Sequence, residues 1–103
     1  MHRILVIADH PSISPQARTY AEYRVFAVVA RHTQSVRRVR LVLRSAEATS
    51  PREKVSCSVT VHLEPSGSLR IRVTGSHAYE AINRAVDQLN LALERRLAQL
   101  APA

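Results

Sequence analysis

Residues 76–97 constrain the fold most, because their pattern predicts a long amphipathic helix. Apolar residues recur there at spacings of three and four, which places them in one stripe along a helix. The stripe consists of Ala78, Ile82, Ala85, Val86, Leu89 and Leu93. Gly75 ends the preceding segment, and Ser76 is a suitable N-cap. Since such a helix is not stable alone in water, the rest of the chain must supply an apolar surface for it.

The length of 103 residues predicts one domain spanning residues 1–103, because it supports a single hydrophobic core. A hydrophobic content of 46% with only two glycines argues against disorder. Cys57 is the single cysteine and cannot form an internal disulfide, and the sequence contains no signal-like start or membrane-length apolar run. These features predict a cytoplasmic protein that has no membrane partner.

The net charge of +7 predicts an anionic partner. All basic residues except Lys54 are arginine, whose planar side chain suits phosphate groups and stacks on bases. A nucleic acid is therefore a more natural partner than an acidic small molecule. The alternative explanation is the codon usage of a GC-rich genome, which enriches arginine, alanine and valine everywhere.

Five further segments show strand or helix patterns. Residues 3–8 form a short apolar run that predicts a strand buried on both faces. Ser14 followed by Pro15 predicts the start of a helix that extends to about residue 31 or 32. Alternating apolar and polar side chains predict three half-buried strands, at residues 36–45, 54–63 and 69–74.

The resulting order, β-α-β-β-β-α, predicts an α+β fold. A strand-helix-strand unit is right-handed and places its helix on one face, and the three alternating strands can pair as an antiparallel meander. Both helices need the same apolar surface. We therefore expect a two-layer sandwich, in which a four-stranded mixed sheet carries two helices on one face and leaves the other face open. Cys57 points inward in this register, as a small buried hydrophobic residue.

The first helix carries a second apolar stripe on the side that should face water. It consists of Tyr23, Phe26, Ala27 and Ala30, at positions i, i+3, i+4 and i+7. One interpretation is that the sheet wraps this helix more deeply. The other is a contact patch for a protein partner or a homodimer, because contiguous apolar surface on a small domain usually marks an interface.

The open face of the sheet is predicted to be rich in arginine. Arg38, Arg40 and Arg44 come from one strand, and Arg70 and Arg72 come from another. The strand between them contributes Ser56, Ser58, Thr60 and His62. Such a face can bind phosphate and ribose oxygens, and the lack of aromatic residues argues against stacking on unpaired bases. The alternative is a solvated face whose charges keep an open sheet soluble.

The sequence predicts no enzyme, no metal site and no cofactor. The histidines and Cys57 lack the spacing of metal ligands, and neither a phosphate-binding glycine loop nor a nucleophile elbow is present. His62 and Cys57 fall on opposite faces of one strand, which argues against a Cys/His pair.

Residues 79–89 resemble the second helix of the ribosome hibernation-promoting factors, also called ribosome-associated inhibitors or sigma-54 modulation proteins. The matching residues are Tyr79, Ala81, Ile82, Ala85, Val86, Asp87 and Leu89. The first helix is similar to the family pattern at Ala17, Arg18, Tyr20, Glu22, Arg24, Val25 and Val28. The β-α-β-β-β-α order extends the resemblance over almost the whole chain.

This resemblance implies a protein that binds the small ribosomal subunit in the mRNA and tRNA channel and blocks translation in idle ribosomes. In the family, basic side chains on and between the helices contact rRNA. Carried over by position, the implied RNA-binding residues are Arg18, Arg24 and Arg31 on the first helix and Arg84, Arg95 and Arg96 on the second. The predicted open face adds Arg38, Arg40, Arg70 and Arg72.

The chain departs from the family at Tyr23, Ala27 and Gln88, where lysines are usual, and at His77, where an acidic residue is frequent. Two of these positions lie in the second apolar stripe of the first helix. The alternative function is therefore a protein-interaction or homodimerisation module of the same fold, with little or no ribosome binding.

Overall fold

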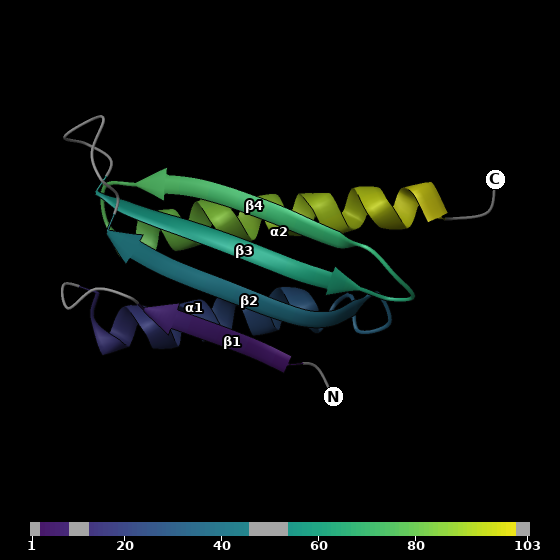
Figure 1. Cartoon of the computed structure of the whole chain (residues 1–103), viewed down its shortest axis with the longest axis horizontal. Helices are drawn as coiled ribbons and strands as arrows, with labels where there is room; N and C mark the ends of the chain where they lie inside the picture. The colour runs from purple at the N-terminus through teal and green to yellow at the C-terminus, as the bar shows by residue number, and fades with distance from the viewer. Residues whose placement is uncertain (1–2, 9–12, 46–53, 101–103) are drawn as a thin grey trace.

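A computed structural model describes residues 3–8, 13–45 and 54–100 and confirms the predicted order of elements (Figure 1). The elements are β1 (Arg3–Ala8), α1 (Pro15–Val29), β2 (Val36–Ser45), β3 (Val55–Leu63), β4 (Ser68–Gly75) and α2 (Ala78–Leu100). The four predicted strands are confirmed to within one residue at each end.

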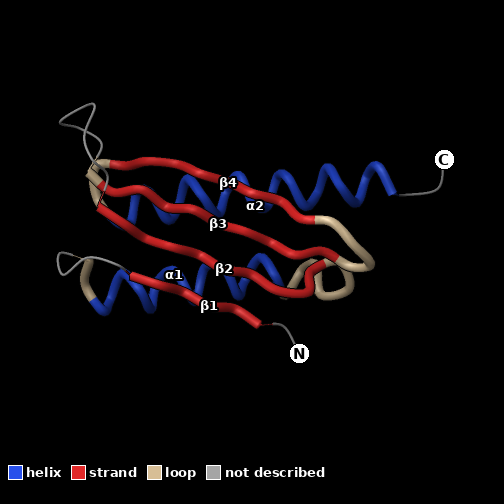
Figure 2. Tube along the Cα trace, in the orientation of Figure 1, coloured by secondary structure: helices blue, strands red, loops and turns tan. Residues whose placement is uncertain are grey.

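The four strands form one mixed sheet in the order β1-β2-β3-β4. Strand β1 runs parallel to β2, whereas the pairs β2–β3 and β3–β4 are antiparallel. Both helices lie on one face of this sheet, as Figures 1 and 2 show. The predicted two-layer arrangement with one open face is confirmed.

The core lies between the sheet and the helices. Alternate residues of β2 and β3, such as Leu41 and Val59, are paired in register and fully buried. They meet Ile82, Leu89 and Leu93 from the apolar stripe of α2, which are also fully buried. Full burial of such a side chain stabilises the fold by about 1.5–3 kcal/mol. Within the described residues, neither helix combines the length and apolarity that a bilayer crossing requires.

Cys57 belongs to this core, as predicted. Its side chain is fully buried, and it sits opposite Leu43 of β2 and Val73 of β4. Burial raises the pKa of the Cys57 thiol to about 12, because a thiolate is poorly solvated among apolar side chains.

Strand β1 differs from the prediction because it is an edge strand. The sequence suggested burial on both faces, but Leu5 is 52% exposed. Leu5 pairs with Arg40 and therefore lies on the open face, whereas Val6 points into the core and is buried. An uninterrupted apolar run does not distinguish a central strand from an edge strand with one uncovered face.

Helix α1 begins as predicted and ends earlier than predicted. The Ser14 side chain accepts a hydrogen bond from the Ala17 N–H at 3.1 Å, and Pro15 occupies the first turn. The helix ends at Val29 rather than at residue 31 or 32. The N–H groups of Arg31 and His32 donate to carbonyls three residues back, which tightens the chain into the turn before β2.

The predicted N-cap of α2 is wrong, because His77 rather than Ser76 caps this helix. The His77 Nδ1 atom accepts a hydrogen bond from the Glu80 N–H at 3.2 Å. The Glu80 carboxylate reaches back and accepts the Ser76 N–H at 3.0 Å. This reciprocal arrangement is similar to a capping box. The Ser76 N–H, together with the positive charge of Arg84, holds the pKa of Glu80 below its usual range, against a smaller opposing effect of desolvation.

We predict that His77→Ala destabilises the protein by about 0.5–2 kcal/mol, because it removes the side-chain acceptor of the cap. The matched control is Ser76→Ala, which keeps the backbone donor and should change the free energy of unfolding by less than about 0.5 kcal/mol. Urea unfolding of both variants measures the difference. An effect of Ser76→Ala as large as that of His77→Ala would contradict this assignment of the cap.

We also predict that Cys57 of the folded protein does not react with a thiol reagent at pH 8, because the thiol is buried and protonated there. Unfolding in denaturant should expose one reactive thiol per chain. The absorbance of the chromophore that the reagent releases measures the number of reactive thiols in the folded and the unfolded protein. Stoichiometric reaction of the folded protein within minutes would contradict the burial of this side chain.

Candidate RNA interface

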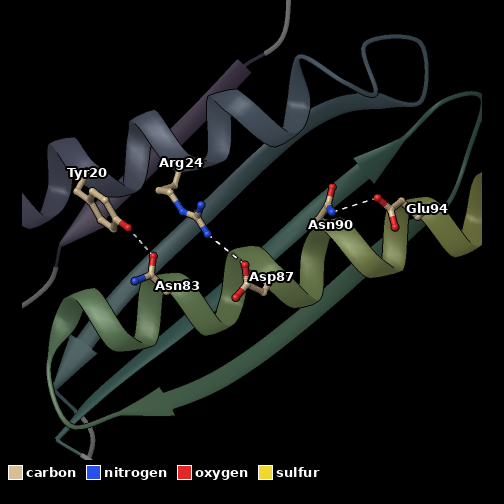
Figure 3. A network of polar contacts seen from close by, with 6 residues as sticks. All are labelled: Tyr20, Arg24, Asn83, Asp87, Asn90 and Glu94. Atoms are coloured by element: carbon tan, nitrogen blue, oxygen red, sulfur yellow. Dashed lines mark hydrogen bonds and ion pairs between the residues drawn. The ribbon is translucent and has the colours of Figure 1, made fainter.

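The two helices run side by side and are joined by polar contacts across their seam (Figure 3). The Tyr20 hydroxyl donates to Asn83 Oδ1 at 2.6 Å. One turn further along both helices, Arg24 Nη2 donates to Asp87 Oδ1 at 3.1 Å. The Tyr20 ring also packs against Tyr79, with 5.2 Å between the ring centroids. These contacts fix the distance between the helices along the first half of α2.

A groove of about 320 Å³ follows these contacts, where the two helices continue toward the end of α1. Its lining combines cationic, amide and small apolar side chains. The lining residues are Arg24, Ala27, Val28, Arg31, Val86, Asp87 and Asn90. Ala27 is small, so the side of the groove formed by α1 is not filled by a long side chain.

Two buried polar atoms of the groove residues have no hydrogen-bond partner among the described residues. They are Nε of Arg24, a donor, and Oδ1 of Asn90, an acceptor. Asn90 extends from α2 toward α1, and its Nδ2 atom donates to Glu94 at 3.2 Å (Figure 3). A buried polar atom without a partner costs about 1–3 kcal/mol. Both atoms are shielded from solvent, so a ligand in the groove reaches them only when the Arg24 and Asn90 side chains move.

Charge in the groove is positive but partly balanced. Asp87 pairs with Arg24, and its own side chain is 72% exposed. Arg31 is exposed at the end of α1 and makes no ion pair or hydrogen bond through its side chain with other described residues. Arg24 and Arg31 together outweigh the single carboxylate, which favours an anionic ligand.

The other arginines that the family resemblance implicates do not lie in this groove. Arg18 pairs with Glu22 at 3.6 Å. Arg84 pairs with Glu80 at 3.3 Å and donates to the Thr74 carbonyl of β4 at 2.8 Å. Contacts with β4 place Arg84 on the side of α2 away from α1.

Arg95 and Arg96 lie near the other end of α2. Arg96 donates to the Ser66 carbonyl in the β3–β4 turn at 3.0 Å. Arg95 is exposed, and its side chain has no such partner in the part of the chain that the structure describes. Arg31 was expected on the first helix but follows its end, so five of the six implicated arginines lie in α1 and α2. The six are spread over several sides of the helix layer.

The open face of the sheet has the predicted arrangement of side chains. Arg40 of β2, Thr60 of β3 and Arg70 of β4 are cross-strand neighbours, and Ser58 pairs with Arg72. Arg38 pairs with His62, further along the same two strands. Arginines of β2 and β4 thus flank a row of hydroxyl groups and one imidazole on β3.

Four arginines of this face are exposed and make no side-chain hydrogen bond or ion pair within the described part of the chain. They are Arg38, Arg40, Arg70 and Arg72. Arg44, at the end of the same row, interacts within the molecule. None of the described residues that point to this face is a carboxylate.

The second apolar stripe of α1 is not wrapped by the sheet. Tyr23 and Phe26 are 71% and 63% exposed, and Ala27 and Ala30 are exposed as well. Tyr23 and Phe26 form a shallow groove with Ile4 of the edge strand. The interpretation that the sheet buries this stripe is wrong, and the stripe is part of the surface.

Sequence reasoning missed the contacts across the helix seam and the role of Asn90. A signal was present, because Tyr20 and Arg24 are four residues apart, as are their partners Asn83 and Asp87. When polar residues have the same spacing on two neighbouring helices, they can form successive hydrogen bonds from one helix to the other. Recognising it requires knowing that the helices are neighbours in this register.

The described residues contain no group of three His, Cys, Asp or Glu side chains that could hold a metal ion. The chemistry that the groove and the open face present is hydrogen bonding and electrostatic attraction. Both surfaces suit a ligand with phosphate groups.

Residues 4–101 match the model of the family described as sigma 54 modulation protein / S30EA ribosomal protein. The N-terminal domain of Protein Y from Thermus thermophilus is similar in structure, with a TM-score of 0.71 and 26% identity over 92% of this chain and 98% of that one.

A ribosomal subunit interface protein from Coxiella burnetii has a TM-score of 0.74 and covers 95% of this chain and 99% of that one. At an identity of 16%, this likeness shows a shared fold alone. No curated protein matches the chain. The family match spans nearly all of the sequence, so the chain belongs to the sigma 54 modulation protein / S30EA ribosomal protein family.

Proposed function

We propose that this protein binds rRNA of the small ribosomal subunit and holds idle ribosomes out of translation, as a cytoplasmic factor without enzymatic activity. Family membership supports association with the ribosome. The protein of the same fold from Coxiella burnetii is a ribosomal subunit interface protein, which is compatible with association of this protein with the ribosome.

The observation that carries the proposal is the groove between the helices, which is lined by the guanidinium groups of Arg24 and Arg31 and the amide of Asn90. RNA offers the complementary groups side by side. A phosphate oxygen accepts from a guanidinium, and a ribose 2′-hydroxyl donates to an amide oxygen. Arg31 adds a free positive charge at the exposed end of the groove.

The net charge of +7 supports the same partner. Positive charge attracts a polyanion over long distances and accelerates association. Each phosphate contact also releases counterions, so affinity for RNA falls as salt rises. Binding to small subunits should therefore weaken strongly when salt is increased.

We predict that Arg31→Glu lowers the affinity for small ribosomal subunits by about tenfold, because one charge-assisted phosphate contact is lost and replaced by repulsion. The slope of log affinity against log salt should fall by roughly 0.7–0.9. Co-sedimentation with purified small subunits at several salt concentrations measures both quantities.

The matched control is Arg37→Glu, which changes the net charge equally. Arg37 is 68% exposed, pairs with Glu64 at 3.8 Å and lies outside the groove. The Arg37→Glu variant should leave the affinity for small subunits within about twofold of the wild type, since a screened surface charge contributes little. Equal losses in both variants, or no loss in Arg31→Glu, would remove the groove from the proposal. Inhibition of an in vitro translation reaction should follow the same ranking.

A second candidate function is a protein contact or homodimer through the outer face of α1. The exposed fractions of Tyr23 and Phe26 favour it, because these aromatic side chains adjoin Ile4 in one shallow groove. Contiguous apolar surface of this kind usually marks an interface.

This candidate predicts that the wild type has about twice the chain mass of 11.5 kDa in light scattering and that Phe26→Asp is monomeric. A charge at the centre of the apolar stripe would be buried without a partner in the dimer. The control Ala30→Ser, at the edge of the stripe, should retain the dimer mass. An unchanged monomer mass in wild type and Phe26→Asp would exclude the homodimer.

A further inference from the structure

We propose that the open face of the sheet is a second binding surface for the backbone of double-helical RNA, separate from the groove between the helices. We call this surface the arginine face and define it by Arg38, Arg40, Arg70 and Arg72. This inference goes beyond the proposed function, which uses the opposite layer of the molecule.

The arginine face carries unbalanced charge. The guanidinium groups of its four arginines are exposed and have no partner within the described residues, and none of the paired strand residues that point to this face is a carboxylate. In the helix layer, Arg18 and Arg84 have nearby glutamates, whereas Arg31 and Arg95 have no partner within the described residues. Like charges on one rigid sheet repel each other. A polyanion lying across the face would relieve this repulsion.

The register sets the spacing of these charges. Arg40 and Arg70 are separated by Thr60 of β3, so their backbones are two strand spacings apart, about 10 Å. Successive outward residues on one strand, such as Arg70 and Arg72, are about 7 Å apart. The face therefore presents two parallel rows of positive charge. Two rows at this separation suit the two phosphate backbones that border a narrow groove of A-form RNA.

The row between the arginines supports RNA rather than a protein partner. Ser58, Thr60 and His62 lie between the two arginine rows and supply hydroxyl and imidazole groups for phosphate or ribose oxygens. The tyrosines and the phenylalanine all lie in the helices, so this face offers no tyrosine or phenylalanine platform on which unpaired bases could stack. Binding should follow backbone shape and be independent of sequence.

The two surfaces face in opposite directions. Both helices lie behind the sheet in Figure 1, so the groove and the arginine face are on opposite layers with the core between them. An RNA segment on one surface leaves the other accessible. One chain can therefore connect two RNA segments, which raises the effective affinity for a folded RNA that presents both.

The first test measures binding to a short blunt RNA duplex by fluorescence anisotropy at several salt concentrations. The variant Arg40→Gln/Arg72→Gln removes two charges from the arginine face. With Arg31→Glu as the background, in which the groove is weakened, we expect at least a tenfold loss of affinity and a fall in the salt slope of roughly 1.4–1.8, which corresponds to two lost phosphate contacts. Arg38→Gln/Arg70→Gln repeats the test at independent positions.

The charge-matched comparison is Arg37→Glu in the same background, which also lowers the net charge by two, lies outside the arginine face as defined here and should leave the affinity for the duplex within about twofold. The second test captures a biotin-labelled duplex on beads and measures whether the protein retains a second, fluorescent duplex. Wild type should retain it, and both Arg40→Gln/Arg72→Gln and Arg31→Glu should not. Each variant should still bind one duplex through its remaining surface.

If both arginine-face variants bind and bridge duplexes as well as the wild type does, this inference is overturned. An acidic protein would then be the better partner for the face. Loss of ribosome co-sedimentation in Arg31→Glu, with duplex binding by the arginine face retained, would support both proposals. Absence of ribosome binding in the wild type, with duplex binding that depends on the arginine face, would reject the proposed function and retain this inference.

Discussion

The structure depends on the burial of one apolar stripe of α2 against the inward side chains of the sheet. Ile82, Leu89 and Leu93 are fully buried there, and they meet inward residues of the antiparallel strands such as Leu41 and Val59. The hydrophobic effect makes this contact the main source of stability. Because both helices need the same apolar surface, they share one face of the sheet and become neighbours.

This one-sided arrangement creates both candidate surfaces. Neighbouring helices form a seam, where Arg24 and Asp87 pair and the groove begins. The uncovered face of the sheet is free for polar side chains, and it holds arginines on two strands beside a central row of hydroxyl groups. Positive charge on both layers is thus compatible with a stable core, because no arginine of either surface has to be buried in it.

Periodicity made much of the fold predictable from the sequence. The α2 stripe and the alternation of β2, β3 and β4 each identify an inward face, so the rows of Arg40, Thr60 and Arg70 followed from parity alone. Local exceptions were not predictable in this way. The cap of α2 uses His77, which is an unusual capping residue, and the exposure of Leu5 depends on where β1 lies in the sheet. The groove forms only where the two helices lie side by side in one register, and the sequence pattern of each helix does not show how the two helices are aligned.

The proposed function requires that the seam between the helices faces rRNA. A cryo-electron microscopy structure of the protein bound to small ribosomal subunits would show which surface does so. We expect RNA backbone within hydrogen-bonding distance of Arg24 and Arg31, with a ribose close to Asn90. A bound protein whose helix seam faces solvent, or faces a ribosomal protein through Tyr23 and Phe26, would contradict it.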